Sequence, residues 1–141
     1  MLRYMGHEEV AVLDGGWQAW VAAGQRVAHG AETAQRRRFN GTPRRERLVT
    51  VEEVSPALSL LDARAAPRYR GEQEPIDPHP GHIPGARNHC WQANLGADGR
   101  FAPAAELERR LAADLGATPN AHTVHYCGSG VSACHNVLAQ V

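Results

Sequence analysis

A strand, a loop of small residues and a helix follow one another around residue 127, and this order constrains the fold most. Residues 123–126 alternate in polarity like a strand, residues 127–130 (Cys-Gly-Ser-Gly) form a turn sequence, and residues 133–139 follow a helical pattern. The amides of such a loop and the positive end of the helix dipole can point at the side chain that ends the strand. A thiolate gains hydrogen bonds there, which predicts that Cys127 is a nucleophile.

The neighbouring sequence supplies more strands and helices in alternation. Residues 59–63 have the pattern of a buried strand that ends in an acidic residue, residues 65–69 suit a helical turn, and residues 81–86 form a tight loop before a strand near residues 87–89. Residues 103–115 are the strongest helix, because leucines recur every four residues, a proline begins it and a glycine follows it. This alternation predicts an α/β fold with a mostly parallel sheet flanked by helices.

The first part of the sequence predicts a separate strand and helix. Residues 7–13 are predicted to form a strand, and residues 17–23 a short helix that ends before Gly24. Trp17 and Trp20 share one face of this helix, which favours core packing over a binding role.

Composition and charge exclude several classes of function. Residues 25–47 are rich in arginine and lack apolar periodicity, so we predict a linker or exposed arm. A nucleic-acid patch is disfavoured, because the chain has no net charge and no stacking platform accompanies the arginines. The sequence has no apolar run of the roughly 18 residues that a membrane span needs, and it does not begin like a signal peptide. Three irregularly spaced cysteines predict a reducing, cytoplasmic setting.

Other kinds of site fit Cys127 less well than a nucleophile does. A cysteine phosphatase places an arginine six positions later, where this chain has Ala133. A redox pair with Cys134 lacks the usual two-residue spacing, and Cys134 is predicted to be a small core residue. A buried inert thiol would not require the Gly-Ser-Gly that follows. A zinc site has suitable ligand types, but they diverge along a strand and a helix: His122, His125, Cys127, Cys134 and His135.

Four segments carry a family pattern, in the same order along the chain. They are residues 12–17 with Trp20, residues 62–71, residues 81–86 (Gly-His-Ile-Pro-Gly-Ala) and residues 127–133 (Cys-Gly-Ser-Gly-Val-Ser-Ala). Together they resemble the rhodanese-type sulfurtransferases. The last segment has the form usual for 3-mercaptopyruvate sulfurtransferases, because it lacks the basic residues found in thiosulfate-specific rhodaneses. The resemblance implies a rhodanese-like α/β fold and sulfur-transfer chemistry.

The resemblance implies a role for each matching residue. The Cys127 thiolate would attack the sulfur of a donor and become a persulfide, and the loop amides would stabilise the added sulfur. Ser129 would hydrogen-bond the substrate or assist proton movement, and Arg68 would bind the donor's carboxylate. His79 takes the place of a second family arginine, so anion binding should be weaker and more pH-dependent. The implied substrate-binding residues are Arg68, His79, Gly128, Ser129, Gly130, Val131 and Ser132.

The implied partners are a small sulfur donor, 3-mercaptopyruvate or thiosulfate, and a thiol, cyanide or thioredoxin-like acceptor. No cofactor, metal, nucleic acid or membrane is implied, and the oligomeric state stays open. Two alternatives accompany this interpretation. Arg64, Arg68 and Arg70 could form surface salt bridges instead of a substrate site. The chain could also be an inactive or weakly active sulfur carrier or binding module rather than an enzyme.

The resemblance also predicts how the chain is divided. Residues 1–24 match the closing strand and helix of a truncated N-terminal rhodanese domain, residues 25–47 are an arginine-rich linker, and residues 48–141 match a catalytic domain that lacks its C-terminal end. Because the two domains of the family are internal duplicates, Glu9–Leu13 is predicted to dock as the missing strand, with the tryptophan pair over the core. The product would be a circularly permuted single domain.

Overall fold

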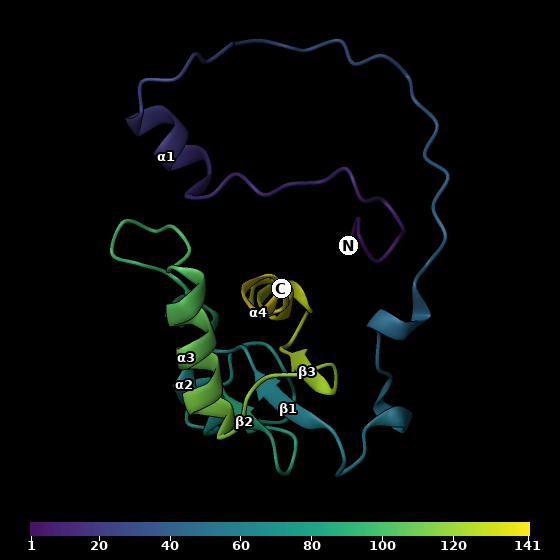
Figure 1. Ribbon diagram of the computed structural model, residues 1–141, viewed down its shortest axis with the longest axis vertical. Coiled ribbons are helices and arrows are strands. Elements are labelled where there is room, and N and C mark those ends of the chain that lie inside the picture. The colour runs from purple at the N-terminus through teal and green to yellow at the C-terminus, as the bar shows by residue number, and fades with distance from the viewer. The chain divides into compact units, whose positions relative to one another are not determined.

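The computed structural model describes residues 1–141, which divide into two units. Figure 1 shows the course of the chain through both. Met1–Glu53 form the first unit and Val54–Val141 form the second. The second unit holds every β-strand and three of the four α-helices, so it is the unit that positions the predicted site. The division predicted at residues 24 and 47 stays a prediction.

A three-stranded parallel sheet forms the centre of the second unit (Figure 1). Its strands are β1 (Ser59–Asp62), β2 (Arg87–Asn88) and β3 (Thr123–Tyr126), in the spatial order β2-β1-β3. The middle strand, β1, pairs with β3 over its whole length. The predicted α/β fold with a parallel sheet is confirmed. Because the strands are parallel, their carboxyl ends meet at one edge, where α/β proteins usually place their ligands.

Two helices, α3 (Ala104–Leu115) and α4 (Val131–Gln140), pack against one face of this sheet. Leu61 of β1 is fully buried in a cluster with two leucines of α3, and Ala139 of α4 packs against the same cluster. Each leucine buried in this way contributes roughly 1.5–3 kcal/mol to stability. As predicted, α3 ends at Gly116, whose φ of 73° favours a residue without a side chain.

Shorter elements fill the connections. α2 (Ala66–Tyr69) follows β1, and the Tyr69 hydroxyl donates a hydrogen bond to the carbonyl of Ala86 at 2.8 Å. This bond holds α2 against the loop that precedes β2.

None of the helices has both the length and the apolar character that a membrane span requires. Three 3-10 turns complete the elements, at Arg45–Arg47, Val51–Glu53 and Trp91–Asn94.

The strand predicted for residues 7–13 is not formed. The sheet consists of β1, β2 and β3, and the structure forms no strand before Ser59. The predicted docking of Glu9–Leu13 as a missing strand of a permuted domain stays a prediction. The amide of Val10 instead bonds to the carbonyl of Glu8 at 2.8 Å, and Val12 is 64% exposed. The physical reason is that a strand depends on a pairing partner, and the first unit contains no strand with which this segment could pair.

The helix predicted nearby is confirmed as α1 (Gly16–Ala22), but its tryptophan pair does not form a core. Trp17 is 62% exposed, and α1 contains no buried residue. Trp20 is partly buried and donates from Nε1 to the carbonyl of Arg26 at 3.1 Å. Core packing is therefore wrong for Trp17, because one short helix offers no second layer to bury it.

A network of buried polar side chains ties the end of β2 to α4. Asn136 donates from Nδ2 to the carbonyl of His89 at 2.8 Å and accepts from Nδ2 of Asn94 at 2.7 Å. His89 Nε2 lies 2.8 Å from Asn94 Oδ1, and its Nδ1 lies 2.7 Å from Asp114 Oδ2. These bonds turn Asn136 inward and fix the rotation of α4 about its axis. Cys134 consequently points outward and is exposed, so its predicted place in the core is wrong.

Candidate active site

Cys127 lies directly after β3, at the carboxyl edge of the sheet. It is partly exposed, and its Sγ accepts a hydrogen bond from the amide of Gly130 at 3.0 Å. The helix α4 begins with the next residue, Val131, so its positive end lies close to the cysteine loop. An accessible sulfur that accepts an amide hydrogen bond beside a helix N-terminus is placed to react as a thiolate.

Gly130 gives this loop its shape. Its φ is 83°, in the left-handed region that favours glycine, and it precedes α4 without any side-chain cap. The amides of the first turn of α4 therefore have no side-chain acceptor and are available to an anion. The amides of Gly128–Ser132 were predicted to converge on the sulfur. The Gly130 amide donates a hydrogen bond to Cys127 Sγ, and no other amide of this range does so.

A buried ion pair lies at the same edge of the sheet, at the end of β1. Asp62 is fully buried, and it accepts hydrogen bonds from Nη2 of Arg64 at 2.6 Å and from the Arg64 amide at 2.9 Å. Arg64 also donates to the carbonyl of Gly81 at 2.6 Å. The hydrogen bond to Asp62 is the main cause of a raised Arg64 pKa. Arg64 is therefore a cation that holds the turn before β2 in place.

Arg68 of α2 is part of the same set of charges and lies next to the cysteine loop. It donates from Nη2 to Glu74 at 2.6 Å and to Asp77 at 2.9 Å. The hydrogen bond from Arg68 and one from the amide of Asp77 lower the pKa of Glu74 to about 2, so Glu74 stays ionised at neutral pH. A Cβ placed on Gly128 would lie 3.8 Å from Arg68 Nη2 and 3.5 Å from Asp77 Oδ2.

The structure thus brings Arg68 to the cysteine loop, whereas no hydrogen bond or ion pair joins His79 to it. His79 is exposed and has no hydrogen bond or ion pair, so its role in anion binding stays a prediction. Ser129 is exposed in the loop, and Val131 is 75% exposed. The salt-bridge interpretation of the arginines fits Arg70, whose ion pair with an acidic neighbour is about half exposed on both sides.

The sequence analysis missed two acidic residues of this site, Glu74 and Asp77. Both contact Arg68 across the turn at Gly71, and Glu74 also lies 3.3 Å from Nη1 of Arg64. The signal in the sequence was a pair of carboxylates that follows a pair of arginines within a few residues. Opposite charges on the two sides of a glycine turn favour ion pairs across it, but the pattern does not say which arginine pairs with which carboxylate.

His125 of β3 points to the opposite face of the sheet from the ion pair. Its Nε2 lies 2.6 Å from Gln140 Oε1, and its Nδ1 is buried without a partner. Because the Gln140 amide group donates to the carbonyl of Asn120 at 3.1 Å, its Oε1 is the acceptor and His125 carries its proton on Nε2. Burial lowers the pKa of His125, because a second proton would place a charge where water cannot solvate it.

This burial predicts that the protein loses stability on acidification. With its pKa lowered in the folded state, His125 binds fewer protons there than in the unfolded chain. The contribution of His125 to the free energy of unfolding should therefore be greatest above the ordinary histidine pKa of about 6.5 and should decrease as the pH drops below it. In denaturant titrations across this range, His125→Gln should show a smaller fall. His122→Gln, which changes an exposed neighbour, should match the parent. An equal fall in both variants would contradict the prediction.

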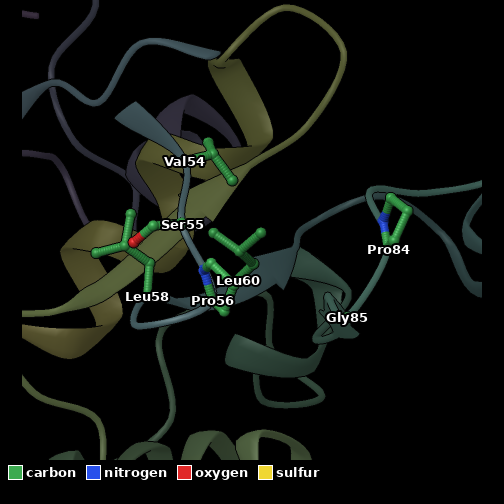
Figure 2. A pocket seen from close by; sticks show the side chains of 7 residues that line it. All are labelled: Val54, Ser55, Pro56, Leu58, Leu60, Pro84 and Gly85. Carbon is green, nitrogen blue, oxygen red and sulfur yellow. The ribbon is translucent and has the colours of Figure 1, made fainter. Parts of the chain in front are cut away.

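A hollow of about 320 Å³ lies elsewhere in the second unit (Figure 2). Figure 2 shows its lining side chains, which come from the segment before β1, from Leu60 of β1 and from the turn before β2. None of them is titratable, and none belongs to the cysteine loop. The hollow therefore supplies no chemistry, and the candidate site is the open edge around Cys127. The full lining is Val54, Ser55, Pro56, Leu58, Leu60, Pro84 and Gly85.

The geometry gives no support to the zinc alternative. No three histidine, cysteine, aspartate or glutamate side chains are placed to share a metal ion. The ring of His135 stacks on Phe101 at a centroid distance of 4.5 Å, His125 bonds to Gln140, and Cys134 is exposed. The candidate ligands therefore point to different parts of the unit.

Comparison with known proteins relates this site to one family. Residues 49–141 match the rhodanese-like domain. A probable 3-mercaptopyruvate sulfurtransferase from Pseudomonas aeruginosa is 46% identical over 145 residues, which cover 99% of this chain and 51% of that protein. The sulfur carrier protein TtuD from Thermus thermophilus is 31% identical over 153 residues, covering 95% of this chain and 52% of that protein. The chain thus spans about half the length of these relatives.

A solved structure shows the same fold. SseA from Escherichia coli, described as a 3-mercaptopyruvate sulfotransferase with the rhodanese fold, superposes with a TM-score of 0.83 and 31% sequence identity. The superposition covers 99% of this chain and 53% of SseA.

Proposed function

The chain belongs to the rhodanese family, and on this premise we propose that it moves sulfur through a persulfide on Cys127. The donor is 3-mercaptopyruvate or thiosulfate, and the acceptor is a thiol, cyanide or a thioredoxin-like protein. The observation that carries the proposal is the hydrogen bond from the Gly130 amide to the accessible Cys127 sulfur, at the end of a parallel strand. A thiolate held there is a partly exposed nucleophile, and the amides of the loop can stabilise the charge of an added sulfur.

The proposed transfer from 3-mercaptopyruvate balances without an oxidant. The Cys127 thiolate attacks the donor sulfur, a sulfur–sulfur bond forms and the donor's carbon–sulfur bond breaks. The bonding electron pair leaves with the carbon as the enolate of pyruvate, which takes up a proton. We assign delivery of this proton to the exposed hydroxyl of Ser129, replenished from water. Cyanide then takes the outer sulfur as thiocyanate and leaves the Cys127 thiolate free.

Charge decides the proposed preference between the two donors. The loop residues Gly128–Ser132 contain no cation, and Arg68 is the charged group beside them that can bind an anion bidentately. One guanidinium matches the single carboxylate of 3-mercaptopyruvate better than the dianion thiosulfate, whose second charge would be left unpaired. We therefore propose 3-mercaptopyruvate as the preferred donor.

Intact-mass spectrometry tests this proposal directly. After incubation with 3-mercaptopyruvate and removal of excess donor, the chain is expected to gain the mass of one sulfur atom. Addition of cyanide should remove this gain and release thiocyanate in equal amount. A chain that gains no sulfur from either donor, while circular dichroism shows it to be folded, would contradict the proposal.

A sulfur carrier is the second candidate function. The environment of Cys127 favours this function. The sulfur accepts a hydrogen bond from a backbone amide, and no titratable side chain bonds to it that could transfer protons during turnover. The similarity to the Thermus thermophilus sulfur carrier protein agrees with this possibility. Repeated addition of donor and cyanide separates the two functions. An enzyme releases thiocyanate over many cycles, whereas a carrier loads once and unloads slowly.

A further inference from the structure

The carboxylate of Asp77 occupies Arg68, the residue to which the proposed function assigns the donor's carboxylate. We propose that Asp77 is an internal competitor, which holds Arg68 in the free protein and is displaced when an anionic donor approaches Cys127. The inference rests on the proposed role of Arg68 as the anion-binding group. It adds a residue that sets how strongly, and how selectively, the site takes carboxylates.

The count of charges shows why displacement is needed. The side chains that contact one another at this edge are two guanidinium groups, of Arg64 and Arg68, and three carboxylates, of Asp62, Glu74 and Asp77. The set has one carboxylate more than it has cations. An incoming anion therefore meets no excess positive charge, and it can bind Arg68 well only if one carboxylate leaves.

Asp77 is the carboxylate that can leave. Glu74 is only 5% exposed and accepts the amide of Ile76 at 3.1 Å and that of Asp77 at 3.0 Å, in addition to Arg68. The side chain of Asp77 is 38% exposed, and its nearest cation besides Arg68 is Arg64, at 3.9 Å. Moving Glu74 would break the turn, whereas moving Asp77 breaks one short ion pair.

The position of Asp77 places the competition next to the nucleophile. A Cβ on Gly128, the residue after Cys127, would lie 3.5 Å from Asp77 Oδ2. The backbone of Asp77 stays fixed through the hydrogen bond from its amide to the Glu74 carboxylate. A rotation of the Asp77 side chain toward water is therefore enough to break its ion pair with Arg68, which keeps its pair with Glu74. The same place is then open for a carboxylate of a donor that reaches toward the sulfur.

The measurable consequence concerns the apparent affinity for small carboxylates. An anion that must displace Asp77 binds more weakly, in proportion to the fraction of time for which Asp77 has left Arg68. Asp77→Asn keeps the size of the side chain and removes its charge. We expect this variant to bind pyruvate, an unreactive carboxylate, roughly three- to tenfold more tightly than the parent chain.

Protection of Cys127 from alkylation reports this binding without any sulfur transfer. The full chain is treated with iodoacetamide at increasing pyruvate concentration, and the alkylation of the Cys127 peptide is followed by mass spectrometry. Exposed Cys134 serves as the internal reference, because its alkylation should not depend on pyruvate. Half-protection is the pyruvate concentration at which alkylation of Cys127 falls to half its rate without pyruvate. We expect this concentration to be lower in Asp77→Asn than in the parent.

Matched variants separate competition from other causes. Asp98→Asn removes the same charge from an exposed turn and should leave half-protection unchanged. Arg68→Ala should weaken protection, and Asp77→Asn should then have no further effect, as a double-mutant cycle requires. Unchanged or weaker protection in Asp77→Asn, or no protection of any variant, would overturn the inference. Sulfur loading of the parent chain by 3-mercaptopyruvate tells separately whether the proposed function itself fails.

Discussion

Replacing Cys127 by serine is expected to abolish sulfur loading, so that the variant keeps its unmodified mass after incubation with 3-mercaptopyruvate. The reason is that a serine hydroxyl is not ionised near neutral pH and is a poor nucleophile toward sulfur, whereas a thiol reacts as its thiolate. Serine also preserves the size of the side chain and an acceptor for the Gly130 amide, so the loop should keep its shape. Mass spectrometry of the intact chain and measurement of released thiocyanate give the two readouts.

The other two cysteines provide the controls for this prediction. Cys134 is exposed on α4, and Cys90 is partly buried after β2. Cys134→Ser and Cys90→Ser should both load one sulfur atom, as the parent chain does. Loading that survives in Cys127→Ser and disappears in Cys134→Ser would move the nucleophile to α4 and contradict the assignment.

Local patterns in the sequence predicted the framework that presents Cys127. The leucines of α3 recur on one face, and they are buried against β1 as this spacing requires. The small-residue turn after Tyr126 predicted a strand end followed by a helix, and β3 and α4 form there. Each of these elements is determined by residues that are close in the sequence, which is why a single sequence suffices to find them.

Features that depend on distant partners were predicted less well. The residues of Glu9–Leu13 have a strand-like pattern, but they form no strand in the structure, because pattern alone does not supply a pairing partner. Cys134 was predicted to be a core residue. The network around Asn136 instead sets the rotation of α4 so that Cys134 is exposed. The contacts of Asp77 with Arg68 needed the loop between them to fold back, which only the three-dimensional structure shows.

The register of the sheet explains why the ion pair and the nucleophile share one edge. Asp62, the last residue of β1, pairs with Tyr126, the last residue of β3, and the amide of Ala63 bonds to the carbonyl of Tyr126 at 2.8 Å. The loop after β1, which reaches Arg64 two residues after Asp62, and the loop after β3, which begins with Cys127, therefore start side by side. The stability of the Asp62–Arg64 pair thus sets the position of the cysteine loop as well.

Arg64→Met is accordingly expected to lower the free energy of unfolding by about 3–5 kcal/mol, the cost of leaving one buried charge without its partner. Asp62 has no exposed surface, and it would lose the guanidinium that now lies at 2.6 Å. Urea titrations followed by circular dichroism measure the change. Arg70→Met, which removes a half-exposed arginine just after α2, should leave the unfolding free energy nearly unchanged.

A double variant shows whether the lost stability comes from the buried charge. Asp62→Asn combined with Arg64→Met removes both charges and keeps an acceptor for the backbone amide at residue 64, which now bonds to Asp62 at 2.9 Å. It should recover much of the stability lost in Arg64→Met, because replacing both partners of a buried pair is far less costly than removing one. If the double variant is as unstable as Arg64→Met, the arginine acts through packing and its bond to the Gly81 carbonyl rather than through Asp62.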